Sequence, residues 1–188
     1  MRSSGSTPSP SPERTVRLLL LFAGEDRPKA CTGRRLVARR LAEAVGPGRA
    51  PRPAPVLLDP RSNVPLSGRD AAVARRGGLL GVDCSWNRLD QRGGYPDLAP
   101  WLSQIPTRRR LPFLLAGNPQ HYGRLGELNT AEAMAAGLYL LGEPERARKI
   151  LSGFGGGEAF FDLNREPLQS YATAADADEL LREERSYF

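Results

Sequence analysis

The stretch Gly81-Val82-Asp83-Cys84-Ser85-Trp86 places a carboxylate, a thiol, a hydroxyl and an indole on consecutive residues. It closes the short apolar run Leu79-Leu80-Gly81-Val82, which has the length of a buried strand. In open α/β sheets, ligands bind outside the carboxyl ends of the strands. Taken alone, the stretch is compatible both with a functional site at a strand end and with a strand whose tryptophan packs into the core.

Strand-like and helix-like segments alternate before this stretch. The pattern predicts a strand at 15–22, a helix at 31–45, a strand at 56–58, a helix at 68–76 and a strand at 79–83. Thr32 is a good N-cap for the first of these helices, and Ser67 with Asp70 suits a capping box for the second. This order predicts an α/β fold with a mostly parallel sheet covered by helices.

The chain after the stretch is expected to be mainly helical. An apolar run at 111–116 predicts one more strand, with Pro112 at its start or edge. Asn129 or Thr130 is expected to cap a helix that ends near residue 141, and further helices are expected at 144–151, 159–171 and 175–186. We therefore divide the chain into a disordered leader (1–14), a sheet-forming N-terminal half (15–110) and a helical C-terminal half (111–188).

The net charge is +6, and Lys29 and Lys149 are the only lysines among 27 basic residues. Arginine prefers forked contacts to phosphate, so the charge favours a nucleic-acid partner, although a GC-rich genome produces the same arginine bias. The sequence shows neither a membrane-spanning run nor a secretory signal, so we expect a cytoplasmic protein. Two cysteines and one histidine predict that no metal is bound.

Two polar helix starts, Thr32-Gly33 and Asn129-Thr130, each follow a predicted strand and loop. Free backbone N–H groups at the positive end of a helix dipole bind carboxylates and phosphates. If both starts point toward the end of the 79–83 strand, they could hold one anionic group together; the alternative is that both are ordinary caps. The sequence carries no Gly-x-Gly-x-x-Gly motif, Walker loop or convincing catalytic triad.

Taken together, the motifs resemble the small-subunit (16S/18S) rRNA aminocarboxypropyltransferases of archaea and eukaryotes. The matching segments occur in the family's order and cover about residues 25 to 188. They are Cys31-Thr32-Gly33-Arg34-Arg35-Leu36, Val82-Asp83-Cys84-Ser85-Trp86-Asn87-Arg88-Leu89-Asp90, Arg110-Leu111-Pro112-Phe113-Leu114-Leu115-Ala116-Gly117-Asn118-Pro119, Tyr122-Gly123-Arg124, Leu128-Asn129-Thr130-Ala131-Glu132-Ala133 and Phe160-Phe161-Asp162-Leu163-Asn164. The sequence departs from the family pattern by one extra residue between Asp26 and Cys31, and at His121, Leu125-Gly126 and Gly156.

The resemblance implies a SPOUT-like fold whose C-terminal half forms a deep trefoil knot. It also implies transfer of the 3-amino-3-carboxypropyl group of S-adenosylmethionine to N3 of a (N1-methyl)pseudouridine in small-subunit rRNA during ribosome biogenesis. By this resemblance the protein is expected to be a monomer that acts on rRNA or the small ribosomal subunit, with no metal and no membrane.

The resemblance also assigns the site. Thr32 and Thr130 would bind the carboxylate of S-adenosylmethionine, backbone groups near Val82 and Leu111 would hold its adenine and ribose, and Trp86 would pack against the methyl-sulfonium end. Asp83 is the catalytic candidate, which would orient or deprotonate the uracil imide. The candidates for salt-sensitive contact with the rRNA backbone are Arg34, Arg35, Arg39, Arg108, Arg109 and Arg110.

Two other functions remain open at this point. A SPOUT-type RNA methyltransferase would share the fold and the S-adenosylmethionine but transfer the methyl group. A ribosome-assembly factor without catalytic activity would bind precursor rRNA only, and such binding requires none of Thr32, Asp83, Trp86 and Thr130.

Overall fold

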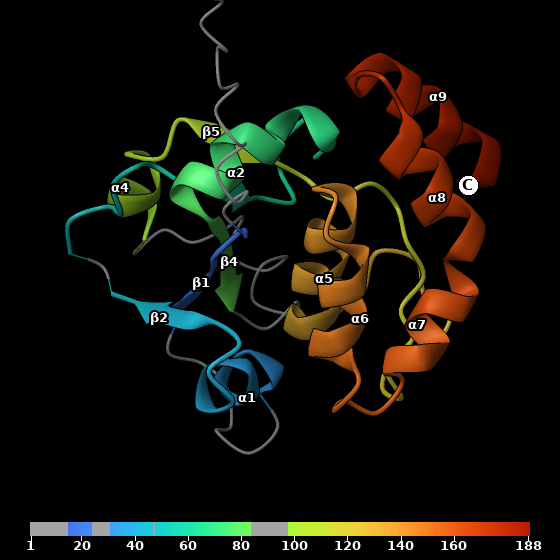
Figure 1. The fold of residues 1–188 in the computed structure, drawn as a ribbon, viewed down its shortest axis with the longest axis horizontal. Coiled ribbons are helices and arrows are strands. Elements are labelled where there is room, and N and C mark those ends of the chain that lie inside the picture. The colour runs from blue at the N-terminus through green and yellow to red at the C-terminus, as the bar shows by residue number, and fades with distance from the viewer. Residues whose placement is uncertain (1–14, 24–30, 47, 84–97) are drawn as a thin grey trace, which may run out of the picture.

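The computed structural model describes residues 15–23, 31–46, 48–83 and 98–188, and in these ranges it forms a five-stranded parallel sheet with helices packed against it (Figure 1). The strand order is β2-β1-β4-β3-β5, so that β4 lies at the centre. The strands are β1 (Leu18–Phe22), β2 (Glu43–Val45), β3 (Val56–Leu58), β4 (Leu79–Asp83) and β5 (Thr107–Arg109). The predicted α/β class with a parallel sheet is confirmed.

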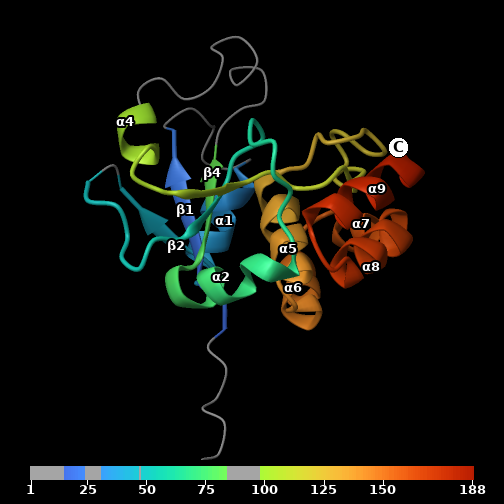
Figure 2. The same cartoon turned by 90° about the horizontal axis from the view of Figure 1, so that it is seen from above.

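The helices lie in layers beside the sheet. Seen from above, α5 and α6 stand between the sheet and the C-terminal helices α7, α8 and α9 (Figure 2). The helices are α1 (Thr32–Ala38), α2 (Ala71–Gly77) after the 3₁₀ turn η1 (Gly68–Asp70), α4 (Ala99–Leu102), α5 (Thr130–Leu140), α6 (Pro144–Leu151), α7 (Gly157–Leu163), α8 (Arg165–Thr173) and α9 (Ala177–Tyr187). Within the described residues, none of these helices combines the length and the apolar character needed to cross a membrane.

Each face of the sheet packs against its own apolar core because side chains alternate along a strand. Leu20 of β1 belongs to the larger core, together with residues of α5 such as Met134. Leu19 points the other way, into a smaller core that contains Trp101 of α4. The sheet approaches α5 closely at Gly81, where an added Cβ would lie 2.9 Å from the sulfur of Met134. Gly81 therefore permits the close packing of β4 on α5.

The helix predicted at 31–45 is wrong in its second half. α1 ends at Ala38, and Arg40 takes a positive φ of 58°, which a continuing helix does not allow. The chain then turns into β2, whose residues pair in parallel with β1, for example Glu43 with Leu19. β2 is short and largely exposed, so its sequence lacks the apolar run that would have indicated a strand.

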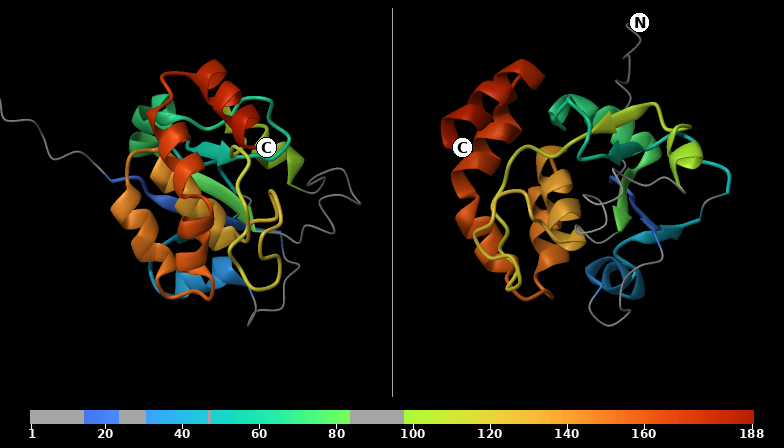
Figure 3. Two further views of the ribbon diagram at one scale, coloured as in Figure 1. Left: turned by 90° about the vertical axis from the view of Figure 1, so that its right-hand side faces the viewer. Right: turned by 180° about the vertical axis from the view of Figure 1, so that it is seen from behind.

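The sheet strand predicted at 111–116 is also wrong. The fifth strand is the arginine-rich β5, just before that segment. Residues 111–116 run on past the sheet beside the C-terminal helices (Figure 3), and the only β-type pairing described within them is an isolated bridge from Leu115 to Leu125.

Helix side chains take the place of a neighbouring strand along this segment. The N–H of Phe113 donates to Glu184 of α9, and the N–H of Leu115 donates to Oδ1 of Asn164. The N–H of Gly117 donates to Glu132 of α5. Because alternate N–H groups of an extended chain point to the same side, three acceptors from three parts of the helical layer satisfy one edge of the segment.

Asn164→Ala tests this arrangement. Asn164 is fully buried, and its amide also donates to the carbonyl oxygen of Leu115. The substitution leaves two backbone groups without partners, and we expect the free energy of unfolding to fall by about 2 to 4 kcal/mol in urea denaturation. The exposed variant Gln169→Ala on α8 is the control, with an expected change within about 0.5 kcal/mol. A loss from Asn164→Ala as small as that of the control would contradict the account.

Candidate active site

Asp83, the last residue of β4, lies buried between the N-termini of α1 and α5. The thiol of Cys31 donates to one of its carboxylate oxygens and the hydroxyl of Thr130 donates to the other. Gly33 packs against the same group, since an added Cβ there would lie 2.9 Å from Cγ of Asp83. The two helix starts thus do converge on the end of β4, and the anionic group that they hold in this structure is the side chain of Asp83.

Thr32 connects the same two helices, although not as the cap of its own helix. The N-cap of α1 is Cys31, whose sulfur accepts the N–H of Arg34 at 3.3 Å, so the prediction of Thr32 as this cap is wrong. The hydroxyl of Thr32 instead accepts the N–H of Ala131, at the start of α5, over 3.3 Å. A thiol has replaced the expected hydroxyl as cap, which leaves the threonine to bridge from α1 to α5.

The start of α5 is a capping box, and of the two cap residues that the sequence allows, Asn129 is the N-cap. The side chain of Asn129 accepts the N–H of Glu132 at 2.9 Å, and the carboxylate of Glu132 accepts the N–H of Asn129 at 2.8 Å. Glu132 is buried and also accepts from the side chain of Asn118 at 2.7 Å. This one carboxylate therefore fixes both the beginning of α5 and the loop that follows the extended segment.

A cavity of about 360 Å³ opens at the carboxyl ends of β3 and β4, within the size range of small-molecule sites. Val82, Leu111 and Thr130, three of the residues that the family resemblance assigns to S-adenosylmethionine, line it together. Leu125 and Gly126, which depart from the family pattern, form part of its wall. Trp86 lies outside the described residues.

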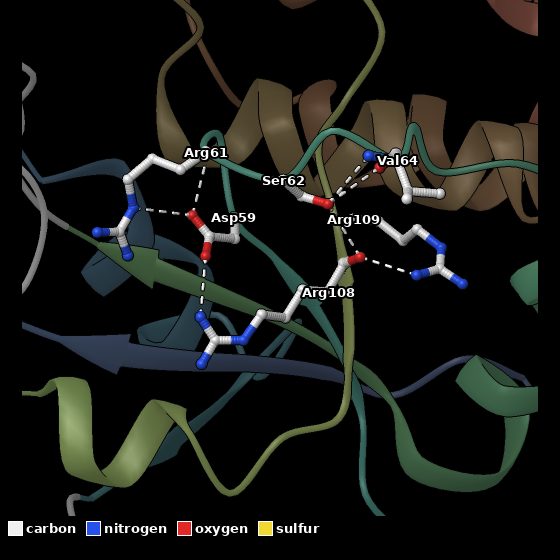
Figure 4. Close-up of polar contacts among 6 residues, drawn as sticks. All are labelled: Asp59, Arg61, Ser62, Val64, Arg108 and Arg109. Atoms are coloured by element: carbon white, nitrogen blue, oxygen red, sulfur yellow. Dashed lines mark hydrogen bonds and ion pairs between the residues drawn. The ribbon is translucent and has the colours of Figure 1, made fainter.

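Asp59, which the sequence analysis did not select, lies at the edge of this cavity and is 5% exposed. Its carboxylate accepts Nε of Arg61 at 3.3 Å and Nη1 of Arg108 at 3.2 Å (Figure 4). The hydroxyl of Ser62 donates to the carbonyl oxygen of Arg108, which ties the end of β3 to β5. The sequence signal was an aspartate directly after a buried strand, the same signal that identified Asp83.

The three arginines at 108–110 all pair with buried carboxylates. Besides the pair of Arg108 with Asp59, Arg109 lies 3.0 Å from Asp70, and Arg110 lies 2.5 Å from Glu184. These acids compensate the positive charge along β5 and just after it. The sequence could not show this, because the nearest of the partners lies 39 residues away along the chain.

The arginines of α1 lie on its surface. The guanidinium of Arg34 stacks 4.9 Å from the ring centre of Phe22, and Arg34 is exposed. Arg35 and Arg39 both lie over Phe154, at 4.4 and 5.0 Å. The six candidate RNA-binding arginines are therefore divided between this helix surface and the paired group at β5. Among the described residues, no group of three or more His, Cys, Asp or Glu side chains could hold a metal ion.

The similarity to known proteins extends over nearly the whole chain. A family model described as "Ribosome biogenesis protein, C-terminal" matches residues 56–188. The 16S rRNA aminocarboxypropyltransferase of Methanosarcina acetivorans is 40% identical over 181 residues, which are 95% of this chain and 98% of that protein. This chain belongs to the rRNA aminocarboxypropyltransferase family.

Other members of the aminocarboxypropyltransferase family agree with this assignment. The 18S rRNA aminocarboxypropyltransferase of Schizosaccharomyces pombe is 37% identical over 166 residues, which are 87% of this chain and 54% of that protein. The solved structure of Tsr3 from Vulcanisaeta distributa, described as a SAM-dependent rRNA:acp-transferase, superposes with a TM-score of 0.73 at 29% identity and covers 91% of this chain and 97% of that one. The resemblance inferred from the sequence motifs is confirmed.

Gly33→Ala tests the packing around Asp83. The new methyl group would lie 2.9 Å from both Cγ and Oδ1 of that residue, so the carboxylate or the start of α1 must move. We expect the free energy of unfolding to fall by about 1 to 3 kcal/mol in urea. Gly48→Ala is the matched control, because a Cβ at Gly48 would meet nothing within 4 Å. Equal stability of the two variants would contradict the close contact.

Proposed function

We propose that this protein transfers the 3-amino-3-carboxypropyl group of S-adenosylmethionine to N3 of a (N1-methyl)pseudouridine in small-subunit rRNA during ribosome biogenesis. The observation that carries the proposal is the cavity at the ends of β3 and β4, lined by Val82, Leu111 and Thr130, in a chain whose relatives bear the name of this activity. The position N3 and the pseudouridine base come from the family resemblance.

In this reaction N3 attacks the carbon that joins the aminocarboxypropyl chain to sulfur. The bond from that carbon to sulfur breaks, 5′-methylthioadenosine leaves, and N3 loses its proton. S-adenosylmethionine carries three carbons on its positive sulfur, so the way it is held decides which group moves. Reacting atoms must approach to roughly 3 to 3.5 Å in line, which makes orientation the main task of the protein.

We propose that the start of α5 receives the carboxylate of S-adenosylmethionine. The N–H groups of Ala131 and Glu132 already donate to Thr32 and Asn129. The anion would therefore meet the backbone N–H of Thr130, and the positive end of the helix dipole would attract it. Thr32 supports this site by joining α1 to α5. Backbone groups near Val82 and Leu111, which both line the cavity, would hold adenine and ribose.

Asp83 would orient the site rather than deprotonate the base. Its side chain is 5% exposed, and both carboxylate oxygens accept hydrogen bonds, from Cys31 and from Thr130. A carboxylate in this state fixes the Thr130 hydroxyl and the first turns of both helices. Any contact with the uracil imide would be that of a hydrogen-bond acceptor.

Trp86 would select the transferred group. We propose that its indole packs against the methyl and the sulfonium, since aromatic faces attract cations. This would leave the aminocarboxypropyl chain facing the RNA. Of the arginines, Arg34 on α1 and Arg39 at its C-cap are exposed, and we propose that they contact rRNA phosphates together with Arg35. Arg108, Arg109 and Arg110 would support the site through their carboxylate partners. They would contact the RNA only through guanidinium N–H groups that do not bind these carboxylates.

Further features are part of the same proposal. We propose that residues 111–188 form the knotted half of a SPOUT-like fold, that residues 15–110 form the other half after the leader 1–14, and that the protein acts as a monomer in the cytoplasm. The leader lies outside the described residues.

Doubly labelled S-adenosylmethionine tests the function. One label is in the carboxyl carbon and the other in the methyl group, and the substrate is small-subunit rRNA that lacks the modification. We expect only the carboxyl label to enter the RNA. Methyl label alone would make the protein a methyltransferase, and bound RNA that gains neither label would favour an assembly factor; either result would overturn the proposal.

A further inference from the structure

Glu184 of the last helix contacts two residues that line the cavity. This residue of α9 is 4% exposed, and its two carboxylate oxygens pair with the two terminal nitrogens of Arg110 at 2.7 and 2.5 Å. The same carboxylate accepts the N–H of Phe113 at 2.6 Å. Arg110 and Phe113 both line the cavity, whereas Glu184 is not among its lining residues.

The contacts of Glu184 continue to the backbone that faces the cavity. Arg110, held by Glu184, donates to the carbonyl oxygen of Leu111 at 3.0 Å, and its guanidinium lies 5.4 Å from the ring centre of Phe113. The carbonyl oxygen of Phe113 accepts the hydroxyl of Tyr171 from α8 at 3.3 Å. Both backbone polar groups of Phe113 are thus bound by the helix pair α8–α9.

This segment depends on such contacts because it is not part of the sheet. The backbone of Arg110 still bonds to Val64 and Leu66, at an isolated bridge to Pro65, but residues 111–113 follow beyond the ladder of β5. A strand inside a sheet is positioned by its two neighbours, but here a forked, charge-assisted pair and one N–H···carboxylate bond perform that task. A shift of the pair would move the Leu111 backbone and the Phe113 ring together.

We propose that Glu184 is a positioning residue of the S-adenosylmethionine site, which sets the 110–113 wall through Arg110 and the N–H of Phe113. The inference rests on the proposed function, because it takes the cavity to be where S-adenosylmethionine binds. Under this proposal α9 affects the affinity for S-adenosylmethionine, and Glu184 itself does not contact the reacting atoms.

Glu184→Gln is the variant to examine. It keeps the shape of the side chain but removes the charge and one acceptor of the forked pair, so the wall loses its fixed position. We expect S-adenosylmethionine to bind at least about tenfold more weakly in calorimetric titration, because the loss of a charge-assisted hydrogen bond releases the residues that line its site. KM for S-adenosylmethionine should rise by the same factor as the affinity falls, while kcat stays within about threefold of the wild-type value.

Glu143→Gln is the matched control. Glu143 accepts the N–H of Val16 at 2.7 Å and pairs with Arg146 at 2.8 Å, and Arg146 also donates to the carbonyl oxygen of Val16. This is the same kind of carboxylate–arginine–backbone contact, at the start of β1, and none of its residues lines the cavity. We expect a similar loss of thermal stability with unchanged affinity for S-adenosylmethionine.

The outcomes separate this inference from the proposed function. If the wild-type chain binds S-adenosylmethionine and both variants bind it equally well, the inference fails and the function stands. If the wild-type chain binds none, both fail. If Glu184→Gln does not fold, Arg110→Lys is used instead, because it keeps the positive charge but loses the two parallel hydrogen bonds to Glu184. Unchanged affinity of Arg110→Lys for S-adenosylmethionine would overturn the inference.

Discussion

The carboxylate of Asp83 is the group on which the site depends. A buried carboxylate is costly unless hydrogen bonds and positive potential compensate it. Here the compensation comes from Cys31, from Thr130 and from the starts of two helices, so the end of β4 is held against α1 and α5. The cavity adjoins this junction, because Val82, which precedes Asp83 in β4, and Thr130, which donates to its carboxylate, both line it.

The part of the lining that follows β5 is held in a different way. Residues 111–117 run on beyond the strand, and their N–H groups donate to Glu184, Asn164 and Glu132, all of which come from the helical C-terminal part of the chain. β4 therefore supplies lining residues directly, whereas the lining residues 111–113 depend on the helical layer through Glu184. This arrangement explains why a site at the carboxyl ends of the strands involves the last helix of the chain.

The sequence predicts those elements that are determined by interactions between residues close together in the chain. The apolar run of β4, the capping box at Ser67–Asp70 and a helix start at Asn129 or Thr130 are readable because each is complete within a few residues. β2 could not be predicted, since an exposed three-residue edge strand exists only through its pairing with β1. The position of the segment at 111–116 could not be predicted either. Its apolar residues predict an extended chain, but they do not show which groups accept the hydrogen bonds of its N–H groups. The partners of Arg108 to Arg110 are likewise fixed only by the tertiary fold.

The most direct test of the account is a comparison of wild-type protein and Asp83→Asn by two readouts. These are the affinity for S-adenosylmethionine and the single-turnover rate of aminocarboxypropyl transfer at saturating S-adenosylmethionine across pH. If Asp83 orients the site, the affinity for S-adenosylmethionine falls at least about tenfold, because hydrogen bonds to the charged carboxylate are lost, while the saturated rate stays within about tenfold and its pH profile keeps its shape. Unchanged affinity with a saturated rate reduced by about 10² to 10⁴, as expected for the loss of a general base, would contradict the account.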